Sequence, residues 1–456
     1  MGSTAVPDQP APISIRPSLR ASSPPDGPLA PWRFGLGLLL VAVGAAGFAI
    51  AFRTGLSWSL AGYSGALDVV SAIRSLPPVY RLLLPPLGGL CAGLLGMIAA
   101  RFGNQGVGDV MEAVALGRVQ LSIRVTLLKS LASFCAIASG GSIGREGPLI
   151  QFGGACAQLV STRLGLSATH TRRLIAAGVA AGFAAAYNTP FTAVLFVLEV
   201  VTGVVVLDAV LPALIATTIS TLLTRASVGE SAIYGQRVFV LHSPAELFAF
   251  AGLAVTTALV AVLFMSLLTW AEERYRALAW PLPLKAASGG LLTGVCVAVL
   301  PDIAGNGYEP LNLLLDGEFV PSFVCLLLCG KLIATISTVA SGSPGGVFTP
   351  TLLIGGATGF LYASVLGHVA QLGPSGGYAL VGMAAATAAC THAPLMAAVL
   401  VFELSGDYAI ALPLVLSTAL ATAVSRRVHR QSIYAAELKR RGISWELTFE
   451  GRRVTR

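Results

Sequence analysis

Charged residues are scarce in this chain. Only 11% of its 456 residues are Asp, Glu, Lys or Arg, whereas soluble domains contain about one-quarter. Hydrophobic residues make up 55% of the chain, and the mean hydropathy is +0.79. A soluble globular protein is therefore excluded, and the composition predicts an all-α polytopic membrane protein embedded in a lipid bilayer.

Residues that support enzyme chemistry are also few. Five histidines are scattered through the sequence without a His-x-x-Glu-His motif, and the sequence has no Walker-type phosphate loop. The seven cysteines all lie in apolar runs, and none has a metal-ligand spacing with a histidine. We therefore expect no metal site, no cofactor, no ATP-driven transport and no enzyme activity.

The formal net charge is +8, but the positions of the basic residues argue against a nucleic-acid partner. They crowd the two ends of the chain, which fits the positive-inside rule with both termini cytoplasmic. We interpret them as topology signals and expect no nucleic acid to bind. The basic residues are Arg16, Arg20, Arg33, Arg426, Arg427, Arg430, Lys439, Arg440 and Arg441.

Composition also divides the chain into segments. Residues 1–32 are rich in Pro, Ser and Ala and lack an apolar core with a cleavage site, so they predict a disordered cytoplasmic tail and not a signal peptide. The first membrane helix is expected to run from Phe34 to about Phe52. The remaining expected segments are a first membrane repeat (33–224), a polar linker (225–247), a second membrane repeat (248–436) and a cytoplasmic tail (437–456).

One stretch, Gly140-Gly-Ser-Ile-Gly-Arg-Glu-Gly-Pro148, differs from the apolar region around it. Non-helical backbone at bilayer depth survives only where it is buried in protein or lines a wet cavity. A charge at that depth costs about 2.5–3.5 kcal/mol on insertion scales, so Glu146 is expected to be functional. We predict an interrupted helix that restarts near Pro148, with free N–H groups directed at an anion and Glu146 beside it.

The second half of the chain repeats this pattern. Residues 129–140 match residues 331–342 at an offset of 202, and later positions match at an offset of 204. Matched broken segments in two halves are typical of a transporter with its site at the repeat interface. The equivalent pairs are Lys129 and Lys331, Gly144 and Gly346, Pro148 and Pro350, Gly178 and Gly382, Pro190 and Pro394, and Glu199 and Glu403.

Together these motifs closely resemble those of the CLC family of chloride channels and proton/chloride antiporters, over roughly residues 33–436. Gly144-Arg-Glu-Gly-Pro148 fits the family's GREGP motif, and Gly345-Gly-Val-Phe-Thr-Pro350 fits its GxFxP motif. Asn104-Gln-Gly-Val-Gly-Asp109 lies where the family has GSGIP followed by an acidic residue. Ser432-Ile-Tyr434 fits a late tyrosine segment.

The resemblance implies a CLC fold of two inverted repeats with broken helices, in a homodimer with a separate anion pathway in each subunit. Helix N-termini would converge on anions near the bilayer centre. Their partial positive charge holds an anion without the full cation that would trap it. The expected protein is a bacterial-type member without regulatory C-terminal domains, located in the cell inner membrane.

The same resemblance implies roles for individual residues. Glu146 would be the external gating glutamate, whose carboxylate occupies an anion site and swings out when protonated or displaced. A structural ion pair with Arg145 is the alternative for Glu146. Tyr434 would hold the central anion through its hydroxyl, and an interfacial aromatic anchor is its alternative. The implied anion-binding residues are Gln105, Gly144, Arg145, Gly147, Val347, Phe348 and Tyr434.

The first glycine-rich motif departs from the family pattern. Gln105 replaces the serine that usually contacts the central anion, and Gly108 replaces the proline of the motif. A glutamine amide still donates an N–H, but it is bulkier and also presents a carbonyl. A preference for another anion, such as nitrate or fluoride, therefore stays open beside chloride.

Val200 marks a second departure, because antiporters of the family have a proton-relaying glutamate at this position and channels have valine. The neighbouring Glu199 points about 100° away on a helix, and we expect it to be a structural or interfacial carboxylate. The sequence thus predicts chloride transport that is channel-like or weakly coupled to protons. An obligate proton/chloride antiporter that uses water or another carboxylate is the alternative.

Overall fold

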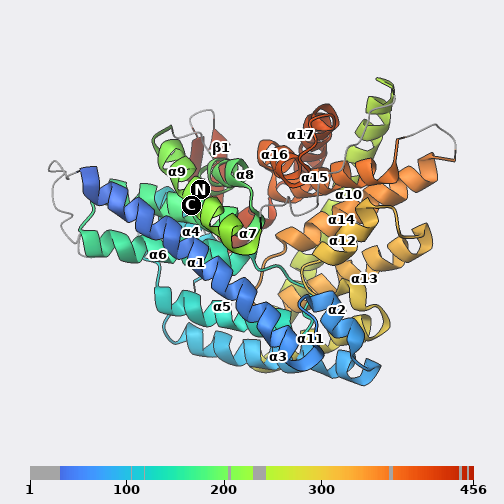
Figure 1. Cartoon of the computed structure of the whole chain (residues 1–456), viewed down its shortest axis with the longest axis horizontal. Helices are drawn as coiled ribbons and strands as arrows, with labels where there is room; N and C mark the ends of the chain where they lie inside the picture. Colours follow the sequence, from blue (N-terminus) through green and yellow to red (C-terminus); the bar gives the residue numbers. More distant parts are fainter. Residues whose placement is uncertain are drawn as a thin grey trace, which may run out of the picture.

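The computed structural model describes residues 31–103, 105–117, 119–203, 207–229, 243–368, 373–440, 444–448 and 451–455. These residues are nearly all helical (Figure 1). They also contain an antiparallel hairpin of β1 (Ser444–Thr448) and β2 (Gly451–Thr455). The tail expected over residues 1–32 lies almost wholly outside the described residues.

The helices of the first half lie mostly on the left of Figure 1 and those of the second half mostly on the right, while α3 and α11 pack together below. The first half contains α1 (Pro31–Ser64), α2 (Val69–Ser75), α3 (Pro78–Ala100), α4 (Val107–Leu116), α5 (Ile123–Ala138), α6 (Glu146–Leu164), α7 (Ala168–Tyr187), α8 (Pro190–Leu195), the π-helix η1 (Phe196–Thr202) and α9 (Leu207–Val228). The second half contains α10 (Glu246–Ala277), α11 (Leu282–Val299), the 3-10 helix η2 (Pro301–Ile303), α12 (Tyr308–Leu315), α13 (Pro321–Ala340), α14 (Phe348–Leu366), α15 (Ser375–Thr391), α16 (Pro394–Ser405), α17 (Ala411–Val428) and α18 (Ile433–Arg440).

Seven of the described helical segments are long and apolar enough to cross a bilayer, for which about 20 residues are needed. They differ in how far other helices cover them. The segment Phe348–Leu366 is 72% buried over its apolar window, against 33% for Pro78–Ala100. The chain is therefore a multi-pass membrane protein in which α14 is enclosed by protein, as an element that carries a buried site should be.

The two repeats pack their central helices in the same way. A Cβ on Gly153 of α6 would lie 2.0 Å from the carbonyl oxygen of Gly178 on α7. In the second repeat a Cβ on Gly355 of α14 would lie 2.3 Å from the carbonyl oxygen of Gly382 on α15. Any side chain there would separate the helices, so the small residues permit the close backbone contact seen in membrane helix pairs.

Two glutamates also link the repeats, because each one binds the start of a helix in the other half. Glu199, in η1, accepts a hydrogen bond from the backbone N–H of Met396 in α16 over 2.7 Å. Glu403, in α16, accepts one from the backbone N–H of Thr192 in α8 over 2.7 Å. Carboxylates stabilise helix N-termini through the free N–H groups and the helix dipole. This arrangement fits the structural role expected of Glu199.

Several local expectations are corrected. Helix α1 continues past Phe52 to Ser64. Arg53 lies within this helix and lines a cavity, so its charge does not mark the helix end. Helix α6 begins at Glu146, two residues before Pro148, so the predicted restart of the helix near Pro148 is confirmed. Pro148 is then the third helical residue, whose N–H would have no helical partner anyway.

The segment that contains Val200 is a π-helix and not the α-helix that was expected; such turns occur frequently at functional sites. The ends of the expected linker also shift. Helix α9 continues to Val228 and α10 begins at Glu246, so both extend into the segment 225–247. The tail that begins at residue 437 contains the end of α18 and the β1–β2 hairpin.

Replacing Glu403 or Glu199 by alanine should lower the melting temperature of the detergent-solubilised protein. Each change removes hydrogen bonds to a carboxylate, and one such bond contributes about 1.5–3 kcal/mol. Glu273→Ala is the matched control, because Glu273 is exposed on α10. Equal melting temperatures for all three variants would contradict a role of the two caps in stability.

Candidate functional site

The interrupted segments of the two repeats meet through a pair of backbone hydrogen bonds. The N–H of Gly144 donates to the carbonyl of Gly346 over 2.7 Å, and the N–H of Gly346 donates to the carbonyl of Gly144 over 2.8 Å. These two glycines occupy equivalent positions in the two repeats, so the pair lies at the interface between the repeats. The pairing brings the starts of α6 and α14, with their free N–H groups, to one point.

Glu146 turns its carboxylate toward this point. The residue is only 2% exposed. Its Oε1 accepts a hydrogen bond from the backbone N–H of Thr349 over 3.1 Å, and its Oε2 accepts one from Thr349 Oγ1 over 3.1 Å. The carboxylate therefore takes up N–H groups at the start of α14 that would otherwise be free to bind an anion.

The geometry does not favour the alternative of an ion pair between Glu146 and Arg145. Within the described part of the chain the Glu146 carboxylate is held by hydrogen bonds, and the ion pairs involve other residues. The guanidinium of Arg145 lies over the ring of Tyr308, 5.6 Å from the ring centroid. Such a cation–π contact stabilises the charge of Arg145, so that Arg145 needs no carboxylate partner.

The position of the carboxylate depends on the absence of side chains at the two paired glycines. A Cβ on Gly144 would lie 2.1 Å from Glu146 Oε2, and a Cβ on Gly346 would lie 2.2 Å from Glu146 Oε1. Both distances are far below van der Waals contact. The seat of the carboxylate, defined here as the space between Gly144, Gly346 and Thr349, therefore requires glycine on both sides.

A small cavity of about 130 Å³, called here the tyrosine cavity, reaches Glu146 and is also lined by Gly147, Val347 and Tyr434. The ring of Tyr434 packs edge-on against Phe196, with 5.9 Å between centroids. These contacts place Tyr434 at the site, which favours its expected role over that of an interfacial anchor. The cavity thus brings together Glu146, Gly147, Val347 and Tyr434 from the residues named from the sequence, whereas Gln105, Gly144, Arg145 and Phe348 do not line it.

Phe348 contributes its backbone and not its ring. The residue is 3% exposed. The ring packs against Phe183 and Tyr187, with 5.5 Å between centroids in each case. The Phe348 side chain therefore fixes the start of α14, while its backbone lies beside the Glu146 carboxylate.

A larger cavity of about 510 Å³, called here the arginine cavity, is lined by Arg53, Arg145 and Arg225 together with Asp68 and Glu309. With three cationic and two anionic side chains, the lining of this cavity has a net positive charge, which concentrates anions. Arg145 lines this cavity, whereas its neighbour Glu146 lines the tyrosine cavity. Adjacent residues of one motif thus face the two cavities.

Gln105 does not line either of these two cavities. Its Nε2 donates to the carbonyl of Gln120 over 2.6 Å, and its Oε1 accepts from the N–H of Ser122 over 2.8 Å. The amide would have to leave these partners to contact an anion. The missing proline at Gly108 is offset by Asp109, which accepts the N–H of Gly106 at the start of α4.

Val200 is 1% exposed within η1. Its apolar side chain packs in the hydrophobic core that residues of both repeats form. A carboxylate placed at this position would have to be buried, which is costly unless it is paired or protonated.

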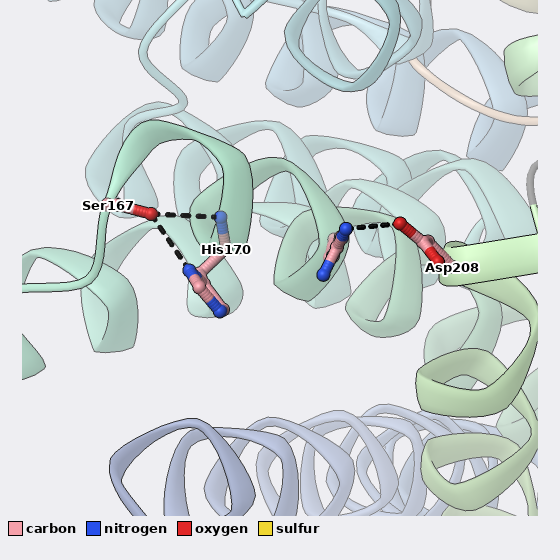
Figure 2. Close-up of polar contacts among 4 residues, drawn as sticks. Ser167, His170 and Asp208 are labelled. Carbon is pink, nitrogen blue, oxygen red and sulfur yellow. Dashed lines mark hydrogen bonds and ion pairs between the residues drawn. The ribbon is translucent and has the colours of Figure 1, made fainter. Parts of the chain in front are cut away.

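A serine–histidine contact elsewhere is explained by helix capping. Figure 2 shows Ser167 Oγ bonded to both the backbone nitrogen (3.5 Å) and the ring Nδ1 (2.8 Å) of His170. Ser167 is the N-cap of α7, where such bonds satisfy free N–H groups. Asp208, also in Figure 2, pairs with Arg173. The contact therefore forms part of the start of a helix.

Three residues at the site were missed from the sequence: Thr349, Tyr187 and Lys331. Thr349 stands at the variable place of the GxFxP motif. Tyr187 is the last residue of α7, directly before its C-cap Asn188. Lys331 is fully buried and donates to the carbonyls of Ile303 (3.0 Å) and Gly305 (2.8 Å). A hydroxyl inside a motif was the available signal for Thr349, whereas nothing in the pattern indicated what Lys331 contacts.

Broken helices that meet at a buried carboxylate between a positive cavity and a smaller one define a class of anion-transport membrane protein. Residues 88–426 match the family described as voltage gated chloride channel. The chain belongs to this family, whose members are channels and transporters and not enzymes.

Sequence relatives cover nearly the whole chain. A protein of Ralstonia nicotianae described as a ClcB-like chloride channel is 36% identical over 402 residues, which cover 86% of this chain and 93% of the relative. The voltage-gated ClC-type chloride channel ClcB of an Escherichia coli strain is 34% identical over 408 residues, which cover 87% of this chain and 95% of the relative.

Solved structures share the fold. A slow cyanobacterial Cl−/H+ antiporter superposes with a TM-score of 0.79 at 23% identity, covering 90% of this chain and 98% of that one. A CLC-type fluoride/proton antiporter superposes with a TM-score of 0.72 at 24% identity, covering 88% and 96%. The prediction of a CLC fold with two inverted repeats and broken helices is confirmed.

Gly346→Ala should displace the Glu146 carboxylate from its seat, because the new Cβ would lie 2.2 Å from Oε1. A structure of the variant in lipid, solved by electron cryomicroscopy, would show where the carboxylate goes. Gly147→Ala is the matched control, because its Cβ would meet the nearest atom at 3.6 Å, an ordinary contact. An unmoved carboxylate in Gly346→Ala would contradict the steric argument.

Proposed function

We propose that the chain transports chloride across the bacterial inner membrane, with Glu146 as the gating glutamate and with channel-like or weakly proton-coupled transport. The observation that carries this proposal is the position of the Glu146 carboxylate on the N–H groups at the start of α14. An anion of similar charge can bind the same donors once the carboxylate leaves. Gating is then competition between a tethered anion and a free one.

Two features support a pathway through this site. The arginine cavity attracts anions without placing a full cation at the carboxylate seat, because Arg145 lies over Tyr308. The tyrosine cavity offers Tyr434 and the backbone around Val347 on the other side. We propose Gln105, Gly144, Arg145, Gly147, Val347, Phe348 and Tyr434 as the residues that bind or position the anion.

The uncoupled mode rests on Val200, which carries no proton and is buried in the core. The alternative, an obligate antiporter, requires water or another carboxylate with access to Glu146. Glu272 on α10 is such a candidate, because it lines the tyrosine cavity together with Glu146 and His429. This shared cavity keeps the antiporter as the second candidate function.

A flux assay separates the two modes. Purified protein in liposomes with a chloride gradient should release chloride without proton movement, measured by a chloride electrode and an external pH electrode together. Proton uptake against its gradient, locked to chloride release, would favour the antiporter instead. Loss of that proton uptake in Glu272→Gln would then assign the relay to Glu272.

Glu146→Ala should keep or increase chloride release and remove its dependence on pH, because no carboxylate competes with the anion. The same liposome assay at external pH values from about 4 to 8, which spans the usual titration range of a glutamate, measures this. Glu273→Ala, on the exposed face of α10, is the control. A Glu146→Ala variant that retains the pH dependence of the parent protein would contradict the gate.

Anion preference depends on whether Gln105 reaches the pathway. If it does, Gln105→Ser should shift the preference among chloride, nitrate and fluoride toward chloride, because a smaller hydroxyl replaces an amide. Competition of each anion with chloride release gives the series. An unchanged series would mean that Gln105 keeps its contacts with Gln120 and Ser122 during transport.

We also propose a homodimer in the lipid bilayer with both termini cytoplasmic. The exposed apolar side chains of α9 and α17, including Leu211 (65%) and Leu412 (70%), provide a surface for a second copy or for lipid. Cysteine crosslinking from these two positions in membranes would distinguish the two. Crosslinked pairs of chains support the dimer, and their absence at both positions opposes it at this surface.

A further inference from the structure

Two hydroxyl groups stand behind the Glu146 carboxylate in one continuous chain of hydrogen bonds. Thr349 Oγ1 lies 3.1 Å from Glu146 Oε2, and Tyr187 Oη lies 2.8 Å from Thr349 Oγ1. Tyr187 and Thr349 are each 1% exposed. They come from α7 in the first repeat and α14 in the second, so the chain of bonds crosses between the repeats.

The direction of these bonds follows from the protons that are available. An ionised carboxylate only accepts hydrogen bonds, so the Thr349 hydroxyl must donate its single proton to Glu146. The oxygen of Thr349 is then left as an acceptor toward Tyr187, whose hydroxyl donates to it. The order of donation is therefore Tyr187 to Thr349 to Glu146.

This chain of hydrogen bonds favours the charged form of Glu146 in its seat. Hydrogen bonds to an ionised acceptor are roughly twice as strong as neutral ones, and neighbouring bonds polarise each other. A carboxyl protonated on Oε2 would donate to Thr349 Oγ1 and reverse both hydroxyls, and a carboxyl protonated on Oε1 would oppose the backbone N–H of Thr349. Protonation therefore weakens the contacts that hold the carboxyl in its seat. Protonation of Glu146, which opens the proposed gate, therefore also changes the hydrogen bonds of Thr349 and Tyr187.

We propose that Thr349 is a positioning residue that holds the ionised carboxylate of Glu146 in its seat, and that Tyr187 orients the Thr349 hydroxyl for this contact. This inference rests on the proposed function of Glu146 as the gate. The two residues set the balance between the seated and the released carboxylate, and so the rate of anion passage and its dependence on pH.

Other charged and titratable groups surround the seat, and they remain unchanged in the variants below. They come from the N-cap of α6, from α10, α12, α13 and α18, and from the turn before α18. These groups are Arg145, Glu272, Tyr308, Glu309, Lys331, His429 and Tyr434.

Thr349→Val removes the hydroxyl and keeps the shape and the backbone N–H. It should increase chloride release from liposomes at neutral pH by about tenfold, since loss of one hydrogen bond to a charged group corresponds to at least that factor. The pH of half-maximal activation by acid should rise by about one unit, because the charged form loses a donor. Thr349→Ser, which retains the hydroxyl, should behave like the parent protein.

Thr351→Val is the matched control for this change. Thr351 is a buried threonine on the same helix, and its Oγ1 bonds the carbonyl of Val347 over 2.8 Å, away from Glu146. Tyr187→Phe should move rate and pH profile in the same direction as Thr349→Val, by about two- to fivefold, because a neutral hydrogen bond contributes less. Its control is Tyr378→Phe, a buried tyrosine that donates to Glu246 over 3.0 Å.

The double variants decide whether the hydroxyls act through Glu146. In a Glu146→Ala background, Thr349→Val should change neither the rate nor the pH profile. An equal increase in that background would overturn the proposal, because the hydroxyl would then act on the anion directly. The proposal would also be overturned if Thr349→Val, made in the parent protein, left the rate and the pH profile unchanged. The same holds if Thr351→Val had an effect of equal size.

A structure of Thr349→Val in lipid tests the contact between Thr349 and Glu146 independently of whether Glu146 is the gate. If Glu146→Ala retains normal pH dependence, the proposed gate fails, whereas the position of the carboxylate in Thr349→Val still tests the contact. A carboxylate displaced from the seat supports the positioning role, and a carboxylate that stays between Gly144 and Gly346 rejects it. Size-exclusion profiles confirm that each variant is folded.

Discussion

The arrangement of the site depends on one contact, the reciprocal hydrogen bonds between Gly144 and Gly346. It joins equivalent positions of the two repeats, so it fixes both halves relative to each other and places the starts of α6 and α14 together. Each helix brings N–H groups that cannot bond within the helix. The seat of the Glu146 carboxylate exists because these two starts meet and because both paired residues lack a side chain.

The same near-symmetry gives different functions to equivalent positions. Glu146 and Phe348 are each the first residue of their helix. The carboxylate of Glu146 enters the seat, whereas the ring of Phe348 packs against Phe183 and Tyr187 and anchors α14. Glu199 and Glu403 keep equivalent roles, since each caps a helix of the other repeat. The repeats thus share one architecture, while the equivalent residues Glu146 and Phe348 have different roles at the site.

Electrostatics at the site rely on partial charges. The full cations Arg53, Arg145 and Arg225 line the arginine cavity, and Lys331 is bound to backbone carbonyls. The carboxylate itself is held by backbone N–H groups and a hydroxyl. Such donors bind an anion and release it again, because they do not carry the long-range attraction of a full charge.

The sequence by itself determined the membrane class, the repeat, the broken helices and the residues of the two central motifs. Low charge, glycine and proline placement, and a buried carboxylate are local features that the chemistry of a bilayer restricts strongly. Only the tertiary structure decided which groups meet the carboxylate. Thr349 and Tyr187 lie far from each other in sequence, and their contacts with each other and with Glu146 depend on how the two repeats pack. The π-helix around Val200 was likewise beyond reach, because the apolar pattern of that segment does not distinguish one helical form from another.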